Sequence, residues 1–426
     1  MKHWMFLLSL FVSFNVLADE DYSLDVTVTK LNTKPDWRVS YRFSHDVSQL
    51  DFSTTPYAFM NEHWGFPTSQ GQFNYFNLKF SFNEAGAEFF IGVRGTDTRF
   101  NSGFFTSFVN FESGQDAVYL GHYLPRSVVV NGKNIAIDEF NIKYRLEDKT
   151  GGAVYYPNAE QNLDYRQALN YAFFGSFKIQ KFEQFDLILS SKLPQWLRES
   201  YLQAAPRLMA YFTNSFKTEL SAKPLIAIGF DEQEATQWSD GGAIKNQVLI
   251  NVVGSKWQAF HPGSEAFLVS LLAHEMAHLW NAHHWDGYHV NPWLKEGSAE
   301  LLSDFVLLQL GYITKSGFQN KLRDKQRQCE KDIRNAAIPD MHNVGMRNSI
   351  YGCGLVVLNS ITNKLSLTPF ELWHKLVNTS GGLGYDVFDL LKVIQPSQDR
   401  EFVEQIELLI TPNTLERQSA LLQIAN

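Results

Sequence analysis

The stretch His274-Glu275-Met276-Ala277-His278 decides how the rest of this chain is interpreted. It lies late in an apolar segment that begins near Ser264, where Leu268, Leu271 and Leu272 recur at helical spacing. This spacing predicts a helix in which the two histidines, four residues apart, face the same way. Two imidazoles on one helix face can bind one metal ion, and nitrogen ligands favour zinc.

Glu275 lies beside the two histidines, and its position predicts a chemical role. A carboxylate next to a zinc ion can take the proton of a water molecule that attacks a carbonyl group. The pattern therefore predicts zinc-dependent hydrolysis of peptide bonds, with His274 and His278 as ligands and Glu275 as general base. Because this short pattern also arises by chance in helices, the prediction depends on what else the chain offers.

A third protein ligand is expected, because a catalytic zinc usually has three and keeps one position for water. Glu296 is the first candidate, in a helix that Asn291 and Pro292 begin as N-cap and first residue. Glu300 lies four residues further on the same helix face. A carboxylate there can hydrogen-bond a ligand imidazole from outside the coordination sphere.

His284 is the competing third ligand. It follows His278 by six residues, the spacing of the metzincin pattern HExxHxxGxxH, with Asn281 where that pattern has glycine. Both alternatives keep zinc and the general base. They differ in whether the third ligand comes from the loop after the first helix or from the next helix.

The first eighteen residues have the features of a signal peptide. Lys2 precedes an apolar run from Trp4 to Leu17, and small residues ending at Ala18 suit cleavage before Asp19. We therefore expect residues 1–18 to be removed and the mature chain to be exported, either to the periplasm or into the medium. An uncleaved anchor is the alternative, but the apolar run is short for a bilayer span, so no stable membrane anchor is expected after cleavage.

The net charge limits the kinds of partner that the chain can bind, and the number of cysteines limits the disulfides that it can form. The formal net charge of -8 argues against a nucleic-acid partner, which needs a basic face. The expected partner is a peptide or protein substrate. The two cysteines, Cys329 and Cys353, are too few for a disulfide scaffold, and in an oxidising compartment they are candidates for one disulfide.

The chain is too long for one core, and its pattern changes near residue 183. Residues 19–182 alternate as strands do, and Asn131-Gly132 between two β-branched runs predicts a hairpin. This part is expected to be an antiparallel β-sandwich whose many aromatic residues pack between sheets. Residues 183–426 begin with mixed strands and helices and continue as helices. The fold class is therefore multidomain, with both α and β structure.

Several motifs together resemble the aminopeptidase-N-like gluzincins, the zinc peptidases that also include leukotriene hydrolase. That family has HExxH, eighteen residues, and then a glutamate within WLxEG. Here seventeen residues separate HEMAH from Glu296 in WLKEG. The stretch Tyr351-Gly352-Cys353-Gly354 resembles the family's Tyr-x-x-Gly segment, which implies that Tyr351 stabilises the oxyanion of the tetrahedral intermediate. A weaker similarity, carried by HLWN at residues 278–281, is to the glycyl aminopeptidase family.

The resemblance also implies an architecture and a substrate-binding strand. It implies a saddle-like N-terminal β-domain followed by a thermolysin-like catalytic domain at 183–426, with one zinc per chain. Gly242-Ala243-Ile244-Lys245-Asn246 resembles the family's GAMEN strand, which implies substrate contacts from Gly242, Ala243, Lys245 and Asn246. The family's glutamate in this motif binds the free α-amino group of a substrate. Lys245 replaces it, so we expect something other than a standard aminopeptidase, with exo- or endopeptidase action left open.

A second hypothesis belongs to another class of protein. The chain is then a non-catalytic binding protein that keeps the zinc lobe as a scaffold and holds a partner on its aromatic β-domain. Lys245 favours this hypothesis, because it indicates an altered substrate pocket. Glu275 and Tyr351 argue against it, because a scaffold has no chemical need for either.

Overall fold

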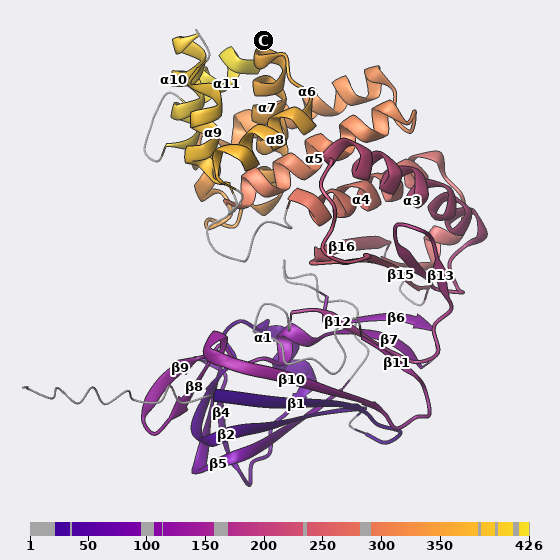
Figure 1. The fold of residues 1–426 in the computed structure, drawn as a ribbon, viewed down its shortest axis with the longest axis vertical. Coiled ribbons are helices and arrows are strands. Elements are labelled where there is room, and N and C mark those ends of the chain that lie inside the picture. Colours follow the sequence, from indigo (N-terminus) through magenta and orange to yellow (C-terminus); the bar gives the residue numbers. More distant parts are fainter. Residues whose placement is uncertain are drawn as a thin grey trace, which may run out of the picture.

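The computed structural model describes residues 22–425, apart from residues 35, 95–105, 113, 157–168, 233–236, 282–290, 382–384, 397–398 and 412–416. Figure 1 shows a lower part built from strands and an upper part built mainly from helices. A sheet-rich N-terminal region followed by a helical C-terminal region was predicted from the sequence, and the structure confirms it. The predicted signal peptide at 1–18 lies outside the described residues.

Sheet A forms most of the lower part. Its main path runs β10-β1-β2-β5-β3, with β4 paired to β5 and the β8–β9 hairpin paired to β2. The eight strands are β1 (Tyr22–Lys30), β2 (Trp37–Asp51), β3 (Trp64–Gly65), β4 (Gly71–Asn74), β5 (Lys79–Val93), β8 (Ser127–Val130), β9 (Lys133–Ala136) and β10 (Phe140–Asp148).

Sheet A contains one hairpin that the sequence predicted and one parallel strand pair that it did not predict. Val130 pairs with Lys133 across a two-residue turn, and both turn residues, Asn131 and Gly132, have positive φ. This confirms the predicted hairpin, since such turns need left-handed residues at both positions. The expectation of a purely antiparallel domain is wrong for one pair, because β1 and β10 are parallel. A pairing between strands so far apart in the chain leaves no local pattern.

Sheet B faces the inner side of sheet A and has the order β11-β12-β7-β6. Aromatic residues from both sheets fill the space between them; Trp37, for example, contacts Phe108 and Phe174 with ring centroids 5.4 and 4.8 Å away. The predicted use of the aromatics for packing is therefore observed. The strands are β6 (Phe108–Glu112), β7 (Gln115–Tyr119), β11 (Val154–Tyr155) and β12 (Tyr171–Phe174). The short helix α1 (Tyr57–His63) also belongs to this part.

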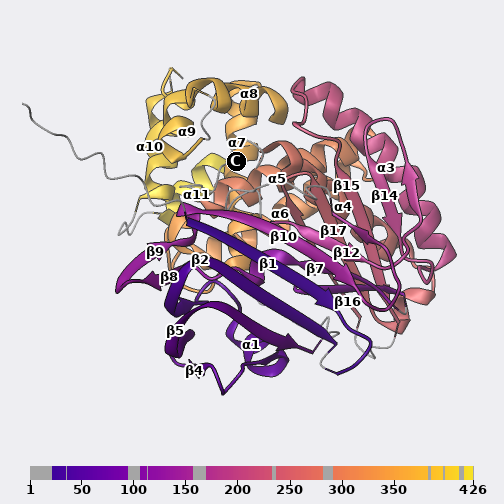
Figure 2. The ribbon, with the colours of Figure 1, turned by 60° about the horizontal axis from the view of Figure 1, so that its bottom comes forward.

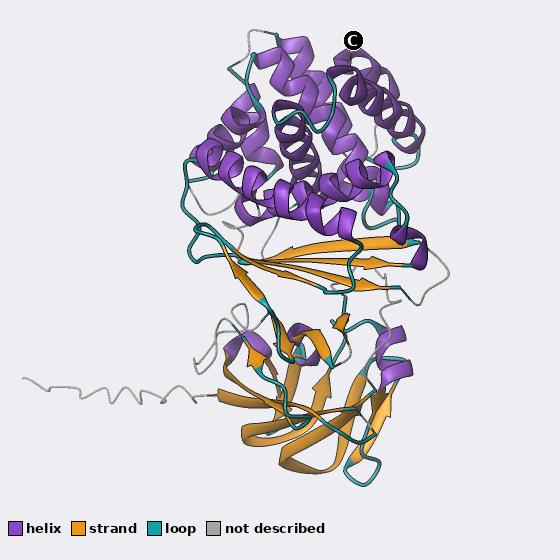
Figure 3. Cartoon of the chain, turned by 90° about the vertical axis from the view of Figure 1, so that its right-hand side faces the viewer, coloured by secondary structure: helices purple, strands orange, loops and turns teal. Residues whose placement is uncertain are grey.

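Sheet C lies between the β-rich part and the helices (Figure 3). Its order is β13-β14-β15-β17-β16, with β14, β15 and β17 parallel and β16 antiparallel at one edge. The strands are β13 (Ile179–Lys181), β14 (Asp186–Leu189), β15 (Leu225–Asp231), β16 (Trp238–Ile244) and β17 (Gln247–Val253). β13 precedes the expected boundary at residue 183 and already pairs with β14.

Helices cover the face of sheet C that points away from sheet B, and one apolar core joins them to the sheet. In chain order they are α3 (Gln195–Phe216), α4 (Pro262–Asn281), α5 (Pro292–Gln309), α6 (Lys315–Asp332), α7 (Arg347–Leu365), α8 (Pro369–Thr379), α9 (Val387–Ile394), α10 (Arg400–Ile410) and α11 (Arg417–Ala425). A disulfide joins Cys329 of α6 to Cys353 of α7, with their Cα atoms 5.1 Å apart. Among the described residues, no helix is both long and apolar enough to cross a membrane.

Candidate metal centre

α4 carries the two histidines on one buried face. Leu268 and Leu272 anchor the helix in the core, and the following turns bring His274 and His278 to the same side, with less than a tenth of either residue exposed. Their Nε2 atoms are 3.1 Å apart. Two imidazole nitrogens that close, deep in the protein, can bind one shared metal ion.

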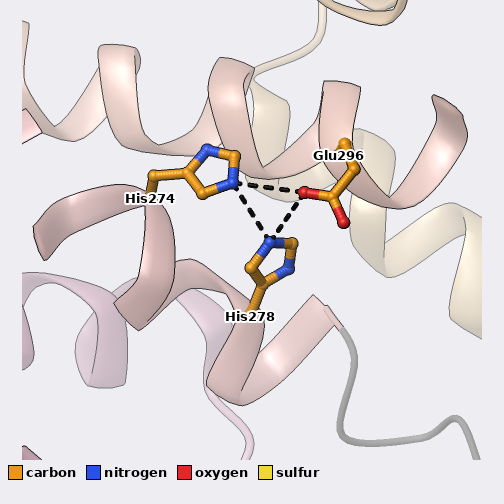
Figure 4. Close-up of side chains that lie close together, drawn as sticks. All are labelled: His274, His278 and Glu296. Atoms are coloured by element: carbon orange, nitrogen blue, oxygen red, sulfur yellow. Dashed lines mark hydrogen bonds and ion pairs between the residues drawn. The ribbon is translucent and has the colours of Figure 1, made fainter. Parts of the chain in front are cut away.

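Glu296 of α5 completes the group (Figure 4). Its Oε2 lies 3.3 Å from Nε2 of His274 and 3.1 Å from Nε2 of His278. In a tetrahedral zinc site with bonds of about 2.0–2.1 Å, two ligand atoms lie about 3.3 Å apart. The three distances therefore match one face of such a tetrahedron, and the donor set fits zinc.

The helix that carries Glu296 begins where the sequence suggested. Asn291 is its N-cap and Pro292 its first residue, as expected. The competing ligand His284 falls at 282–290, outside the described residues.

The charges around the three ligand atoms are strongly coupled. Burial alone would lower the pKa of His274, but the carboxylates of Glu296 and Glu300 outweigh it and raise that pKa to about 10. Burial would raise the pKa of Glu296, yet His278 and Lys295 hold it well below its usual value. The carboxylate is thus ionised at neutral pH, the form that binds a metal ion.

Glu300 stands behind His274, as the sequence suggested for a carboxylate outside the coordination sphere. Its Oε1 lies 3.4 Å from Nδ1 of His274, the ring nitrogen that points away from the metal position. Its other oxygen accepts a hydrogen bond of 2.8 Å from Lys321 of α6, which also donates to Asp304. These contacts place a carboxylate, itself bound by Lys321, behind the imidazole of His274.

Asn281 plays the corresponding part for His278 and was missed as a functional residue from the sequence. Its Oδ1 lies 2.9 Å from Nδ1 of His278, and its Nδ2 donates to the carbonyl of Lys295 and to Ser298. It is fully buried, so the end of α4 is tied to the first turns of α5. The three-residue spacing from His278, which places both on one helix face, could have revealed it.

Glu275 points from α4 toward β16. A Cβ added to Gly241 would lie 2.8 Å from Cγ of Glu275, so the strand can pass this close only with glycine there. Burial raises the pKa of Glu275 to about 7, helped by the charges of Glu296 and Asp240. A carboxylate with a pKa near neutrality is well matched to proton transfer.

Asp240, one residue before Gly241, is a second acidic group near Glu275 that the sequence reasoning missed. Its Oδ2 accepts a hydrogen bond of 3.1 Å from Thr106, which precedes β6 of sheet B. Burial raises the pKa of Asp240, and the hydrogen bond from Thr106 opposes that rise. The contact ties the β-rich part to the edge strand beside Glu275.

The substrate-binding residues predicted by resemblance fall in two places. Gly242 and Ala243 belong to β16, at the edge of sheet C. Lys245 and Asn246 form the turn to β17, where Lys245 has a φ of 50° and Asn246 donates to Ser221. At about 3.3 Å per residue, Lys245 is roughly 13 Å along the strand from the position facing Glu275.

Tyr351 of α7 lies beside His274, one of the three candidate ligands. Its ring centroid is 5.6 Å from that of His274. Burial raises the pKa of Tyr351, and the negative charges of Glu296 and Glu275 raise it further. The phenol therefore stays protonated at neutral pH and keeps a hydrogen to donate.

Comparisons with known proteins agree with this architecture. The sequence matches no family model and no curated protein. The structure is similar to an aminopeptidase N family protein from Idiomarina loihiensis, with a TM-score of 0.66 and 13% identity over 94% of this chain and 78% of that one. It is also similar to yeast leukotriene A4 hydrolase, with a TM-score of 0.52 and 12% identity over 93% of this chain and 70% of that one. The resemblance that the motifs indicated is confirmed in the fold: the chain has the aminopeptidase-N-like architecture.

Proposed function

We propose that this chain is an exported zinc metallopeptidase that hydrolyses peptide bonds in peptide or protein substrates. The observation that carries the proposal is the match of His274, His278 and Glu296 to one face of a zinc tetrahedron, with Glu275 beside it. A zinc ion held there would act as a Lewis acid and lower the pKa of a water molecule. Export rests on the predicted signal peptide at 1–18.

Glu275 would act as the general base and then as the acid. It is buried, so little bulk water competes for its proton. It takes a proton from the attacking water and passes it to the nitrogen of the departing amine. A pKa of about 7 suits both transfers.

Tyr351 would donate its hydroxyl hydrogen to the carbonyl oxygen as negative charge develops on it. A protonated phenol can serve as such a donor, and losing one oxyanion donor typically lowers kcat by about a hundredfold or more. Glu300 and Asn281 take no part in the transfer. They keep the imidazoles of His274 and His278 in the orientation that the ligand set needs.

β16 would hold the substrate. It is an edge strand, and within the described residues its outer side pairs with no other strand. An extended peptide can therefore add to it through backbone hydrogen bonds, with Gly242 and Ala243 in the pairing segment and Lys245 and Asn246 at its end. Lys245 replaces the glutamate of the resembled motif, and this difference supports a preference other than that of a standard aminopeptidase.

The test is digestion of fluorescently labelled casein by the purified chain, with and without a metal chelator. Hydrolysis that the chelator abolishes and added zinc restores supports the peptidase. The matched control is Glu275→Gln, which keeps the ligand set and lacks the base, so it should bind zinc and cleave nothing. Zinc binding without any hydrolysis by the unaltered chain would favour the binding-protein hypothesis.

A further inference from the structure

A cavity of about 1030 Å³ lies over sheet A, in the part of the chain that the proposed catalysis does not use. It is lined mainly by β1, β2, β5 and β10, which lie side by side at the front of Figure 2. Side chains alternate along these strands: one set is buried in the aromatic core between the sheets, and the other faces the cavity. The outward set is Asp25, Thr27, Arg38, Ser40, Arg42, Glu88, Phe90, Lys143 and Arg145.

The side chains that line this cavity carry a net positive charge, whereas the whole chain is net negative. Four cationic and two acidic side chains line it, although the formal net charge of the protein is -8. One pair neutralises itself, because Arg42 and Glu88 form an ion pair of 3.0 Å across neighbouring strands. Positive charge is left on β2 and β10.

The remaining cations form no ion pair with a carboxylate among the described residues, although Asp25 of β1 lies in register with Lys143. Lys143 and Arg145 are exposed and form no ion pair there. Arg38 stacks over the ring of Phe90, with its guanidinium carbon 4.2 Å from the ring centroid. Stacking occupies the face of a guanidinium and leaves its N–H edges free to bind an anion.

The positions of these cations set the kind of anion that fits. Lys143 and Arg145 are two residues apart on one strand, so they face the same way about 6.7 Å apart. Acidic side chains at alternate positions of an extended peptide have the same spacing. Arg145 lies in register with Thr27, Thr27 with Ser40, and Ser40 with Phe90, so hydroxyl groups and a ring continue the row across the sheet.

We propose that this cavity binds an extended, acidic segment of a polypeptide. Lys143 and Arg145 pair with carboxylates at alternate positions of that segment, and Arg38 binds a further carboxylate across the sheet. Phe90 and Tyr155, which also line the cavity, offer ring surface for the peptide's uncharged side chains. The inference is independent of the proposed zinc chemistry, because none of these residues belongs to the metal centre.

The test is fluorescence anisotropy of a labelled ten-residue peptide of alternating glutamate and serine, titrated with the full chain at about 50 mM NaCl, where surface charges are less screened. We expect saturable binding that weakens as salt is added. The double variant Lys143→Glu with Arg145→Glu should weaken it by about tenfold or more, because two attractions become repulsions. Lys133→Glu, an exposed charge reversal at the start of β9 in the same sheet, is the control and should change binding less than twofold.

Three results would overturn the proposal. The first is no binding of the acidic peptide by the unaltered chain at low salt. The second is an equal loss of binding in Lys133→Glu, which would assign the effect to overall charge. The third is tighter binding of a sulfated oligosaccharide than of the peptide, lost in the same double variant, which would assign the cavity to an anionic glycan. Circular dichroism and thermal unfolding of each variant verify that the fold is kept.

Discussion

Gly297 of α5 and Gly354 of α7 meet so closely that a Cβ added to Gly297 would lie 2.5 Å from the Cα of Gly354. Gly297 directly follows the proposed ligand Glu296, and Gly354 lies three residues after Tyr351. The two glycines thus let the backbones of the two helices approach, and this contact places Tyr351 beside the ligand set. It also explains why both motifs contain glycine at these positions.

Gly354→Ala should destabilise the protein and disturb the site. The added methyl group would lie 2.6 Å from the carbonyl oxygen of Trp293, which is backbone and cannot turn aside. Overpacking of this kind costs about 1–3 kcal/mol. The matched control is Gly352→Ala in the same helix, where the new methyl meets only the flexible side chain of Lys325 at 3.2 Å. Urea unfolding of both variants measures the difference, and equal stability of the two would contradict the tight crossing.

Asn281→Ala should weaken zinc binding by about 10- to 100-fold, because His278 loses the partner that fixes its ring. Asn281→Asp is the companion variant, since its carboxylate still accepts from Nδ1 of His278 and should preserve most of the affinity. Competition with a chromophoric chelator gives both dissociation constants. Unchanged affinity in Asn281→Ala would mean that the 2.9 Å contact does not support the ligand.

Matched peptides with free and acetylated N-termini should show no preference for the free amine. Lys245 replaces the glutamate that the resembled motif uses to bind a free α-amine, and it lies in the turn that follows β16. Lys245→Glu should shift kcat/KM toward the free peptides. A strong preference for free N-termini in the unaltered chain would restore the aminopeptidase assignment, and Asp240 would be the carboxylate to test next.

The β-rich part should lose stability as the pH falls, through His122. Burial lowers the pKa of His122 to about 3, and its Nδ1 lies 2.7 Å from Oγ of Ser107. The unfolded chain protonates this side chain near pH 6.5, so it binds more protons than the folded chain between about pH 6.5 and 3. The contribution of His122 to the free energy of unfolding is fully present above that window. Inside the window it falls by about 1.4 kcal/mol for each pH unit that the pH is lowered.

His122→Asn removes the titrating group and should flatten the pH dependence of urea unfolding inside this window. The control is the same series above pH 7, where both proteins should show little slope from this position. Equal slopes for the two proteins between pH 6 and 4 would show that other groups dominate acid unfolding.

Helix periodicity and helix-start signals predicted much of the candidate metal centre. Helical periodicity placed His274 and His278 on one face, and the Asn291-Pro292 start placed Glu296 near the beginning of the next helix. The Asn131-Gly132 hairpin followed from turn chemistry in the same way.

Contacts between distant segments could not be predicted from the sequence. Lys321 reaches Glu300 from another helix, and β1 pairs in parallel with β10. Neither contact leaves a periodic pattern along the chain. The closeness of Gly241 to Glu275 depends on how sheet C packs against α4, which residue spacing does not specify.

The identity of the third zinc ligand is the central claim of the proposed function. It is tested most directly by measuring zinc per chain, by elemental analysis, in the purified variants Glu296→Ala and His284→Ala. The unaltered chain should contain about one zinc ion, held by the two histidines and a carboxylate. Glu296→Ala should lose most of it and His284→Ala should keep it. Loss in His284→Ala with retention in Glu296→Ala would contradict the account and assign the metzincin-like ligand set.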